Sequence, residues 1–221
     1  MYWDKAQDHC RSVYTDLAPV SNKHDMDLFL DDDRINNRSF FWIGLMRNPN
    51  NKDQWLWSGG GEVRENQSFW LPNEPNNHRG TEDYGCQGAN VGWNDAPYDR
   101  LFSFFCYKVH VVRERKTWEE ALDHCREHHK DLASVASDTE LMLMEKELVK
   151  ALISEQVWIG LAFLSGHWLW VDGQPLEYEA WGRGVAPECP GPNGCAALLV
   201  EGDVKVWSAR GCSTKLYFLC Y

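Results

Sequence analysis

Five oxygen-bearing side chains between positions 74 and 95 supply the ligands that a calcium ion needs. They are Glu74, Asn76, Glu82, Asn94 and Asp95. Calcium is a hard cation that takes about six to eight oxygen ligands. Three carboxylates and two amide carbonyls provide most of that number, and the backbone carbonyl of Asp95 could add one more. Pro75 is expected to be cis, which would direct Glu74 and Asn76 toward one ion. The residue types and their spacing therefore predict a calcium site.

The same residue types also form ordinary turns. Asn, Pro, Glu and Asp are common in solvated loops, so Glu74-Pro75-Asn76 alone would be weak evidence for a metal site. However, these residues lie in a long polar stretch that is rich in Gly, Pro and Asn. A stretch of that length is too long for an idle connection in a compact domain. We therefore expect a functional loop.

Helices and short strands must position this loop. In the second half of the chain, positions 118, 121, 122 and 125 place apolar or small side chains on one helical face, and Thr117 with Glu120 forms a capping-box pattern. Apolar residues recur at helical spacing from 138 to 153, which predicts a second helix. The runs Trp-Ile-Gly-Leu and Trp-Leu-Trp are short, aromatic and β-branched, and they predict strands.

The sequence contains one domain twice. Trp-x-x-Ala-x-x-x-Cys begins at Trp3 and again at Trp118, and Trp-Ile-Gly-Leu begins at Trp42 and again at Trp158. The offset is 115 residues for the first motif and 116 for the second, so the copies differ only by small changes in loop length. Each copy is long enough to bury its own core. The predicted domains are residues 1–107 and 108–221.

The eight cysteines indicate an oxidising compartment. Zinc is the rival interpretation, but zinc sites usually contain closely spaced Cys-x-x-Cys pairs, and this sequence has none. We therefore expect disulfides and a secreted or extracellular protein. Met1 is followed directly by Tyr-Trp-Asp-Lys rather than by an export signal, so we expect a truncated N-terminus. Sequons at 37–39 and 66–68 give weak support for glycosylation outside the cell.

These motifs resemble the C-type lectin family. The helix motif, the Trp-Ile-Gly-Leu strand and the closing cysteines Cys106 and Cys220 form the framework of that family, and both copies carry it. The resemblance implies an α+β fold. It would consist of two tandem C-type lectin-like domains, each with two helices, small antiparallel sheets and a long ligand-binding loop.

The resemblance also implies three disulfide bonds. They are Cys10–Cys106, Cys125–Cys220 and Cys195–Cys212. In the first copy Tyr84 and Tyr98 stand where the short-loop pair would be, and contact between their rings could recover part of its stabilisation. Cys86 and Cys189 are left over. They could pair with each other, pair with other chains, or stay free.

In the lectins that this chain resembles, the calcium ligands also bind the sugar. Two vicinal hydroxyls complete the shell of the Ca²⁺ ion, and each can donate to a carboxylate and accept from an amide N–H. By resemblance, Glu74, Asn76, Glu82, Asn94 and Asp95 would do both. His78 would either touch the sugar ring or lie at the surface. Glu-Pro-Asn implies glycans with equatorial 3- and 4-hydroxyls, such as mannose, N-acetylglucosamine and fucose, whereas Gln-Pro-Asp would imply galactose.

Two regions depart from the calcium pattern of the family. A second calcium site near the first should be weak or absent, because Arg47 and Asn77 stand where acids are usual. The second copy has Val185-Ala186-Pro187 in place of Glu-Pro-Asn, and Ser208-Ala209 in place of Asn-Asp. Val and Ala supply no side-chain oxygen, so we expect no calcium there. That copy would serve either as structural support or as a protein-binding module.

Composition narrows the classes of function. The net charge is −11 and both halves are acidic, which argues against a nucleic-acid partner. No apolar run approaches the roughly 20 residues of a membrane span. Because the sequence contains no Gly-x-Ser-x-Gly, His-Glu-x-x-His or phosphate loop, we do not expect an enzyme. The leading hypothesis is calcium-dependent carbohydrate binding through the first copy. The alternative is calcium-independent protein recognition with a vestigial sugar site.

Overall fold

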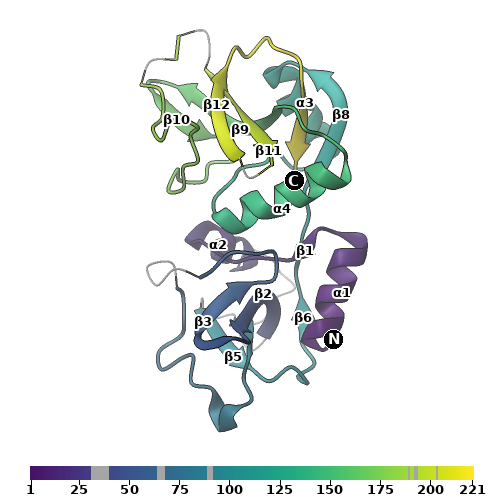
Figure 1. Ribbon diagram of the computed structural model, residues 1–221, viewed down its shortest axis with the longest axis vertical. Helices are drawn as coiled ribbons and strands as arrows, with labels where there is room; N and C mark the ends of the chain where they lie inside the picture. The colour runs from purple at the N-terminus through teal and green to yellow at the C-terminus, as the bar shows by residue number, and fades with distance from the viewer. Residues whose placement is uncertain (31–39, 64–67, 89–91, 189, 192–193, 203) are drawn as a thin grey trace. The chain divides into compact units, whose positions relative to one another are not determined.

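The chain forms two compact units, Met1–Lys108 and Val109–Tyr221. The computed structural model describes residues 1–30, 40–63, 68–88, 92–188, 190–191, 194–202 and 204–221 (Figure 1). Cys189, the sequon at 37–39 and most of the sequon at 66–68 lie outside these residues.

The first unit packs helices against small sheets. Its elements are α1 (Trp3–Val13), β1 (Asp16–Leu17), α2 (Lys23–Leu30), β2 (Phe40–Asn48), β3 (Asn51–Trp57), the short 3₁₀ helix η2 (His78–Gly80), β4 (Tyr84–Gly88), β5 (Gly92–Ala96), β6 (Ser103–Phe104) and β7 (Cys106–Tyr107). One sheet has the order β3-β2-β4-β5, with β6 joined to β2 in parallel. The strands β1 and β7 form a separate antiparallel pair.

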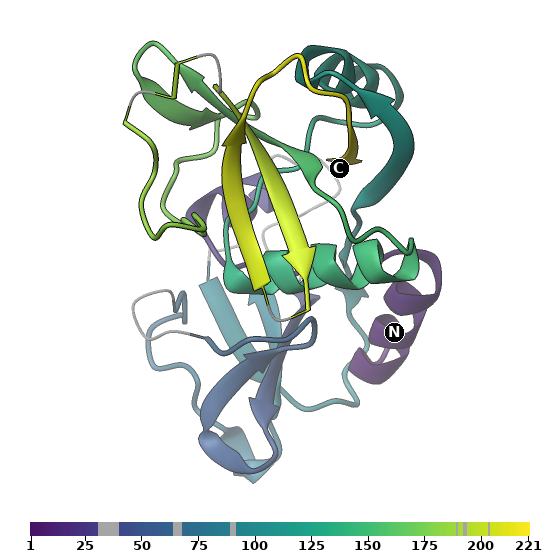
Figure 2. The ribbon, with the colours of Figure 1, turned by 45° about the horizontal axis from the view of Figure 1, so that its top comes forward.

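The second unit repeats the plan with a larger sheet. Its elements are β8 (His110–Lys116), α3 (Trp118–His128), α4 (Asp138–Lys150), β9 (Val157–Leu164), β10 (His167–Trp170), β11 (Cys195–Glu201), β12 (Val204–Arg210) and β13 (Leu216–Cys220). The sheet order is β12-β11-β9-β13-β8, and β10 pairs with β9. The long antiparallel pair of β11 and β12 is seen side by side in Figures 1 and 2. Both units therefore have the α+β fold that the resemblance implied.

Local sequence explains where the helices of the second unit begin and end. The Thr117 hydroxyl accepts from the Glu120 N–H, and the Glu120 carboxylate accepts from the Thr117 N–H, which completes the capping box of α3. The second helix ends at Lys150, before the predicted residue 153. Leu152 adopts a left-handed φ of 55°, and the N–H of Ile153 donates to the carbonyl of Leu148. This closure of the last turn stops the helix.

The same tryptophan contacts organise the core of each unit. The indole N–H of Trp3 donates to the carbonyl of Ile43, and that of Trp118 donates to the carbonyl of Ile159, both at 2.9 Å. Each indole is buried, so the hydrogen bond removes the cost of an unpaired donor. The repeat found in the sequence is therefore also a repeat of specific contacts.

Glycine in the Trp-Ile-Gly-Leu strands allows a close approach of two backbones. A Cβ atom at Gly160 would lie 2.7 Å from the carbonyl oxygen of Leu132, and one at Gly44 would lie 3.0 Å from that of Leu17. The N–H of Gly160 donates to Ala133 in the chain segment after the first helix of its unit. A larger residue would separate the strand from this segment.

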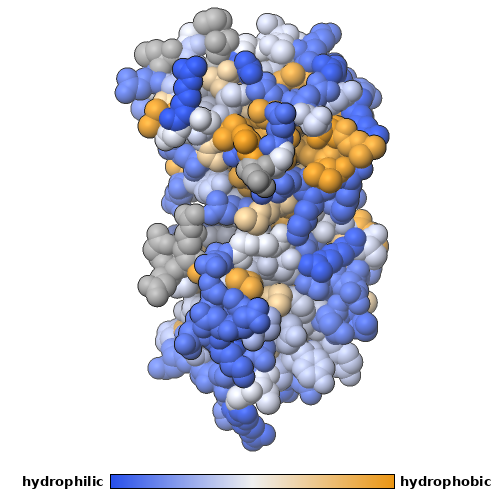
Figure 3. Space-filling view, viewed as in Figure 1, coloured by the Kyte–Doolittle hydropathy of each residue, from blue (hydrophilic) through white to orange (hydrophobic). Residues whose placement is uncertain are grey.

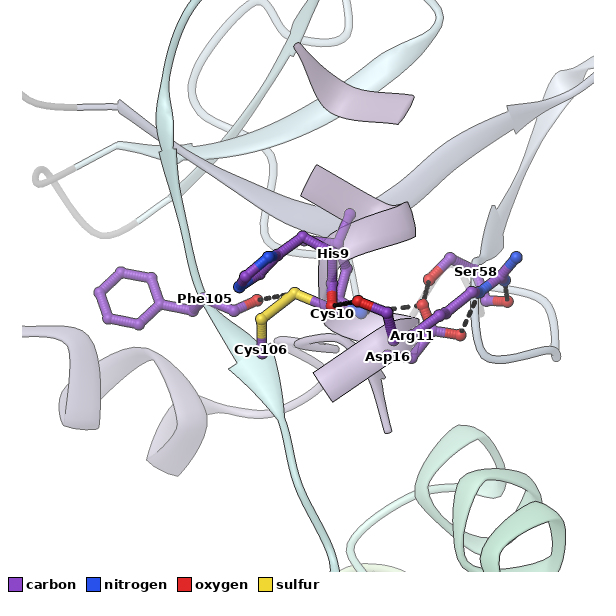
Figure 4. The surroundings of a disulfide bond; sticks show 9 residues. His9, Cys10, Arg11, Asp16, Ser58, Phe105 and Cys106 are labelled. Atoms are coloured by element: carbon purple, nitrogen blue, oxygen red, sulfur yellow. Dashed lines mark hydrogen bonds and ion pairs between the residues drawn. A yellow bond between two sulfur atoms is a disulfide. The ribbon is translucent and has the colours of Figure 1, made fainter. Parts of the chain in front are cut away.

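Three disulfides join cysteines in the described part of the two units. They are Cys10–Cys106, Cys125–Cys220 and Cys195–Cys212, the pairs that the resemblance implied. Figure 4 shows the first of them, which joins α1 to β7. Beside it the buried carboxylate of Asp16 accepts from Arg11 at 3.1 Å and from the Ser58 hydroxyl at 2.7 Å. This end of the first unit is therefore fixed both covalently and by a satisfied buried charge.

Candidate functional site

Strand β5 holds the start of the long loop of the first unit. The N–H of Leu71 donates to the carbonyl of Trp93 at 2.9 Å, and the N–H of Trp93 donates to Phe69 at 2.7 Å. Trp70 then packs edge-to-face on Trp93, whose side chain is fully buried. These contacts fix the backbone of the loop just before the predicted ligands. The Glu74–Pro75 peptide bond is cis, as the sequence predicted.

The first ligand pair meets the carboxylate of Asp95. The backbone N–H of Asn76 lies 3.1 Å from Glu74 Oε2 and 3.0 Å from Asp95 Oδ1, so two carboxylates share one donor. The side-chain amide of Asn76 also donates to Glu74 Oε1 at 2.8 Å. Glu74, Asn76 and Asp95 are therefore brought together although 19 positions separate Asn76 from Asp95.

Glu82 reaches the same short segment from the other side. Its Oε2 accepts from the N–H of His78 at 2.6 Å, and its own N–H donates to Asn77 Oδ1 at 3.1 Å. The N–H of Asn77 donates to Asp95 Oδ2 at 2.9 Å. Asn77 therefore links two of the predicted ligands, a role that the sequence analysis missed. His78 lies on η2 and is exposed.

The side-chain amide nitrogen of Asn94 contacts the backbone of Asp95 and the side chain of Cys86. This nitrogen donates to the Asp95 carbonyl, and it lies 3.8 Å from the sulfur of Cys86 on the neighbouring strand. The Cys86 thiol in turn donates to the Asn94 carbonyl at 3.3 Å. The Asp95 carbonyl, another predicted ligand, is therefore occupied by Asn94 in this arrangement.

The three carboxylates create a strongly negative environment. Burial raises the pKa of the Glu74 carboxyl, and the neighbouring Asp95 carboxylate raises it further. Burial is also the main reason why the pKa of the Cys86 thiol rises to about 12, to which the charges of Asp95, Glu74 and Glu82 add. The negative charges of all three carboxylates therefore act on Cys86 in β4. A cation there would relieve their mutual repulsion.

Arg47 already supplies one positive charge to this cluster. Its guanidinium lies 3.1 Å from Asp95 Oδ2 and 3.0 Å from Asp83 Oδ1, and it donates to the Glu82 carbonyl at 3.0 Å. It also lies over the ring of Trp55, 4.5 Å from the centroid. The side chain of Arg47 is only 9% exposed, and that of Asp95 is fully buried. The sequence predicted that Arg47 weakens a second calcium site, but not that its charge would hold Asp95.

The predicted ligands do not form a ready-made metal site. Among the residues that the structure describes, no three His, Cys, Asp or Glu side chains are grouped so that they could hold a metal ion. The physical reason is that Glu74, Glu82 and Asp95 accept from N–H groups of the loop itself. Nevertheless, the donor set suits calcium chemically. Three carboxylates supply hard oxygen ligands, and together they carry more negative charge than the one nearby guanidinium neutralises. To bind the ion, these carboxylates would have to exchange their N–H contacts for it.

The residues in place of the missing disulfide behave differently from the expectation. The ring of Tyr84 packs on Trp3 with centroids 4.6 Å apart, whereas Tyr98 is 59% exposed. Among the ring contacts of described residues, none joins the two tyrosines, because Trp3 already covers Tyr84. Cys86 is a free and completely buried thiol within the core, so a bond from it to another chain would require the core to open.

In the second unit the matching loop carries no carboxylate at the ligand positions. Val185 is 71% exposed, and Ser208 uses its hydroxyl to accept from Gln156 at 3.0 Å. The disulfide Cys195–Cys212 anchors this region, as predicted. Apolar and hydroxyl groups therefore replace the calcium chemistry of the first unit.

The fold and both cysteine frameworks agree with a family comparison. A model of the "Lectin C-type domain" matches residues 1–108 and again residues 114–221. The chain belongs to the C-type lectin family. Its two C-type lectin domains account for the duplicated tryptophan contacts and for the long loops.

Similar proteins include lectins from snakes. C-type lectin lectoxin-Lio1 of Erythrolamprus poecilogyrus is 32% identical over 120 residues, which cover 52% of this chain and 72% of the relative. Snaclec EMS16 subunit beta of Echis multisquamatus is 31% identical over 134 residues, 59% of this chain and 77% of the relative. Among solved structures, human lithostathine is 26% identical with a TM-score of 0.47, covering 52% of this chain and 93% of that one. None of the described helices is long and apolar enough to cross a membrane.

Proposed function

We propose that this protein is an extracellular, non-catalytic lectin whose first domain binds sugars in a calcium-dependent manner. The sugars would carry equatorial 3- and 4-hydroxyls, as mannose, N-acetylglucosamine and fucose do. The observation that carries the proposal is the single N–H of Asn76 shared between the carboxylates of Glu74 and Asp95. Two carboxylates held this close attract a cation, and oxygen ligands favour calcium.

Residues of the chain would divide the recognition of the sugar. Bound calcium would supply a positive centre that attracts the two hydroxyl oxygens. Glu74 and Glu82 would accept hydrogen bonds from these hydroxyls, while the amides of Asn76 and Asn94 would donate to them. The bonds that Asn76 makes to Glu74 and that Asn94 makes to the Asp95 carbonyl would have to be exchanged for these contacts. Binding would therefore order side chains as well as ligand.

Retention on immobilised mannose tests the proposal. The wild-type chain should be retained in calcium and released by a chelator. The double variant Glu74→Gln with Asn76→Asp should lose retention on mannose and gain it on galactose, because acceptor and donor positions are exchanged. Glu188→Gln, a matched change on the exposed loop of the second domain, should behave as wild type. Retention on mannose that is changed neither by the chelator nor by the double substitution would overturn the proposal.

The second candidate function is calcium-independent recognition of a protein. The buried Arg47–Asp95 pair favours it, because an internal cation already neutralises one predicted ligand. The names of relatives such as the beta subunit of snaclec EMS16 are also those of assembly components. If the purified chain binds no mannose-type sugar at any calcium concentration, while remaining folded, this alternative gains support.

A further inference from the structure

The second domain has a recess where the first domain has its predicted sugar site. Backbone bonds fix the loop that forms its wall: the N–H of Gly182 donates to Trp207 at 3.0 Å, and that of Trp207 donates to Ala180 at 2.7 Å. Further along the loop, the carbonyl of Pro187 accepts from the Trp168 indole at 3.0 Å. The recess has a volume of about 510 Å³ and is open to solvent. We call it the Arg183–Arg210 recess, after its two charged lining residues.

Much of the lining of this recess is aliphatic. Leu199 and Val206 are cross-strand neighbours on β11 and β12, and both are half-buried. Val185, on the loop, also lines the recess and is 71% exposed. Figure 3 shows a small patch of hydrophobic surface where β11 and β12 lie, and a larger one to the right of them, toward the end of α4. An apolar side chain of a ligand would lose contact with water here.

Among the described residues that line the recess, the charged ones are Arg183 and Arg210, and both are basic. Arg210 donates from Nε to Gln156 at 2.6 Å, which holds its guanidinium at the rim. Arg183 is exposed, and no described residue forms an ion pair or hydrogen bond with it among the contacts of the structure. The sequence after Cys106 contains 12 Lys and Arg against 17 Asp and Glu, so this local positive charge opposes the acidity of the domain. Such a placement favours an anionic group.

The burial of the tryptophans argues against a sugar in this recess. Trp181 and Trp207 line it, but they are only 7% and 1% exposed, so neither offers an open ring face on which a sugar could stack. The aliphatic floor instead matches a hydrophobic amino-acid side chain, and guanidinium groups match a carboxylate. We propose that the Arg183–Arg210 recess binds, without calcium, a peptide segment of a partner protein in which an acidic residue stands beside an apolar one.

An array of short peptides in the presence of a chelator tests this proposal with the full chain. The probes are pentapeptides with Asp-Leu or Glu-Phe at the centre, compared with their Asn-Leu, Gln-Phe and Asp-Gly counterparts. Acidic–apolar peptides should bind at least about tenfold more tightly than the amide and glycine counterparts, because a hydrogen-bonded charge pair and an apolar contact are lost in these. Equal binding of acidic and amide peptides would overturn the proposal.

Variants then place the binding in the recess. Arg183→Gln with Arg210→Gln should lower peptide affinity by about tenfold or more, whereas Arg113→Gln, which is outside the recess, should not change it. Val185→Asp introduces a negative charge at an exposed position and should also abolish binding without unfolding the domain. Glu74→Gln should leave it unchanged, which separates this site from the sugar site. If a sulfated oligosaccharide binds at the arginines and the peptides do not, the proposed partner is wrong.

Discussion

Arg47 brings a buried positive charge to the predicted calcium site of the first domain. Its guanidinium contacts the carboxylates of Asp95 and Asp83 and the carbonyl of Glu82, and only 9% of the Arg47 side chain is exposed. A charge that is buried and paired on several sides orders its partners, and removing it leaves those partners unpaired. Arg47 therefore holds one face of the predicted calcium site before any ion binds.

Replacement of Arg47 by Gln should destabilise the calcium-free first domain by about 3 kcal/mol, because Asp95 would be left as an uncompensated buried charge. Added calcium should restore part of this loss by supplying another cation. Urea unfolding in chelator and in calcium measures both effects. Arg79→Gln, an exposed arginine of the same loop, is the matched control and should change stability little. An Arg47 variant as stable as the control in chelator would contradict the argument.

The raised pKa of Glu74 makes calcium binding dependent on pH. Because burial and the Asp95 carboxylate raise this pKa, ionised Glu74 costs the calcium-free fold free energy at high pH, and that cost disappears as pH falls through the raised value. Calcium binds the ionised form and competes with the proton. Calcium affinity, measured by titration calorimetry, should therefore fall as the pH is lowered through the raised pKa of Glu74, and the fall should begin at a higher pH than for a carboxyl group with an ordinary pKa. An affinity that stays constant until the pH reaches the ordinary range of carboxyl groups would contradict the role of Glu74 as a ligand.

Sequence reasoning predicted the types of ligand but not the partners of each side chain. The resemblance supplied Glu74, Asn76, Glu82, Asn94 and Asp95. The cis form of the Glu74–Pro75 bond was expected because it would direct Glu74 and Asn76 toward one ion, and the bond is cis. The contacts of Tyr84 with Trp3, and of Arg47 with Asp95, could not be predicted because each joins segments far apart in the chain. An Arg two residues after Trp-Ile-Gly-Leu, together with Asp83, was the available signal for the second contact.

At the scale of elements, the β4–β5 hairpin carries the site with less covalent support than its counterpart. Cys195–Cys212 anchors the matching region of the second domain, and a disulfide that closes a short loop contributes about 3 kcal/mol. In the first domain Tyr84 packs on Trp3, which supports the start of β4 but leaves the segment 73–82 tied mainly by hydrogen bonds. Ion binding should therefore order this segment strongly.

Limited proteolysis of the intact chain tests this dependence. Cleavage in the stretch from Asn73 to Asn94 should appear in chelator and be suppressed by calcium, because the ion would join Glu74, Glu82 and Asp95. The loop of the second domain, which has no ligand carboxylates at these positions, should be cut to the same extent in both conditions. Mass spectrometry locates the cuts. Full protection of the first loop in chelator would show that Arg47 and the backbone bonds order it without metal.

The helices and strands of each domain were more predictable than the loops between them. The capping box at Thr117 and the helical spacing after Trp118 depend on neighbouring residues, so the start of α3 followed from the sequence. The end of α4 did not, because the left-handed turn at Leu152 is set by a closing contact and not by a glycine. Sequence signals from neighbouring residues were therefore sufficient only for features that depend on neighbouring residues.

At the scale of the whole molecule, the two copies of the domain share their core contacts but differ in the chemistry of their loops. Both domains keep the buried tryptophans Trp3 and Trp118, with equivalent bonds to Ile43 and Ile159. The loops above this shared framework carry opposite chemistry, since carboxylates gather in the first domain and arginines with aliphatic side chains in the second. A core that tolerates different loops allows one fold to carry loops of different chemistry.

This separation predicts that calcium stabilises only the first domain of the intact chain. A ligand that binds the folded state alone stabilises it by about 2.7 kcal/mol at a hundredfold excess over its dissociation constant. Hydrogen exchange read by mass spectrometry should therefore slow in β4 and β5 when calcium is added, and remain unchanged in β11 and β12. In the Glu74→Gln variant the slowing should be reduced, because one carboxylate ligand is lost. Equal slowing in both domains would mean that calcium acts on the chain generally, and the assignment of the ion to Glu74, Glu82 and Asp95 would then be wrong.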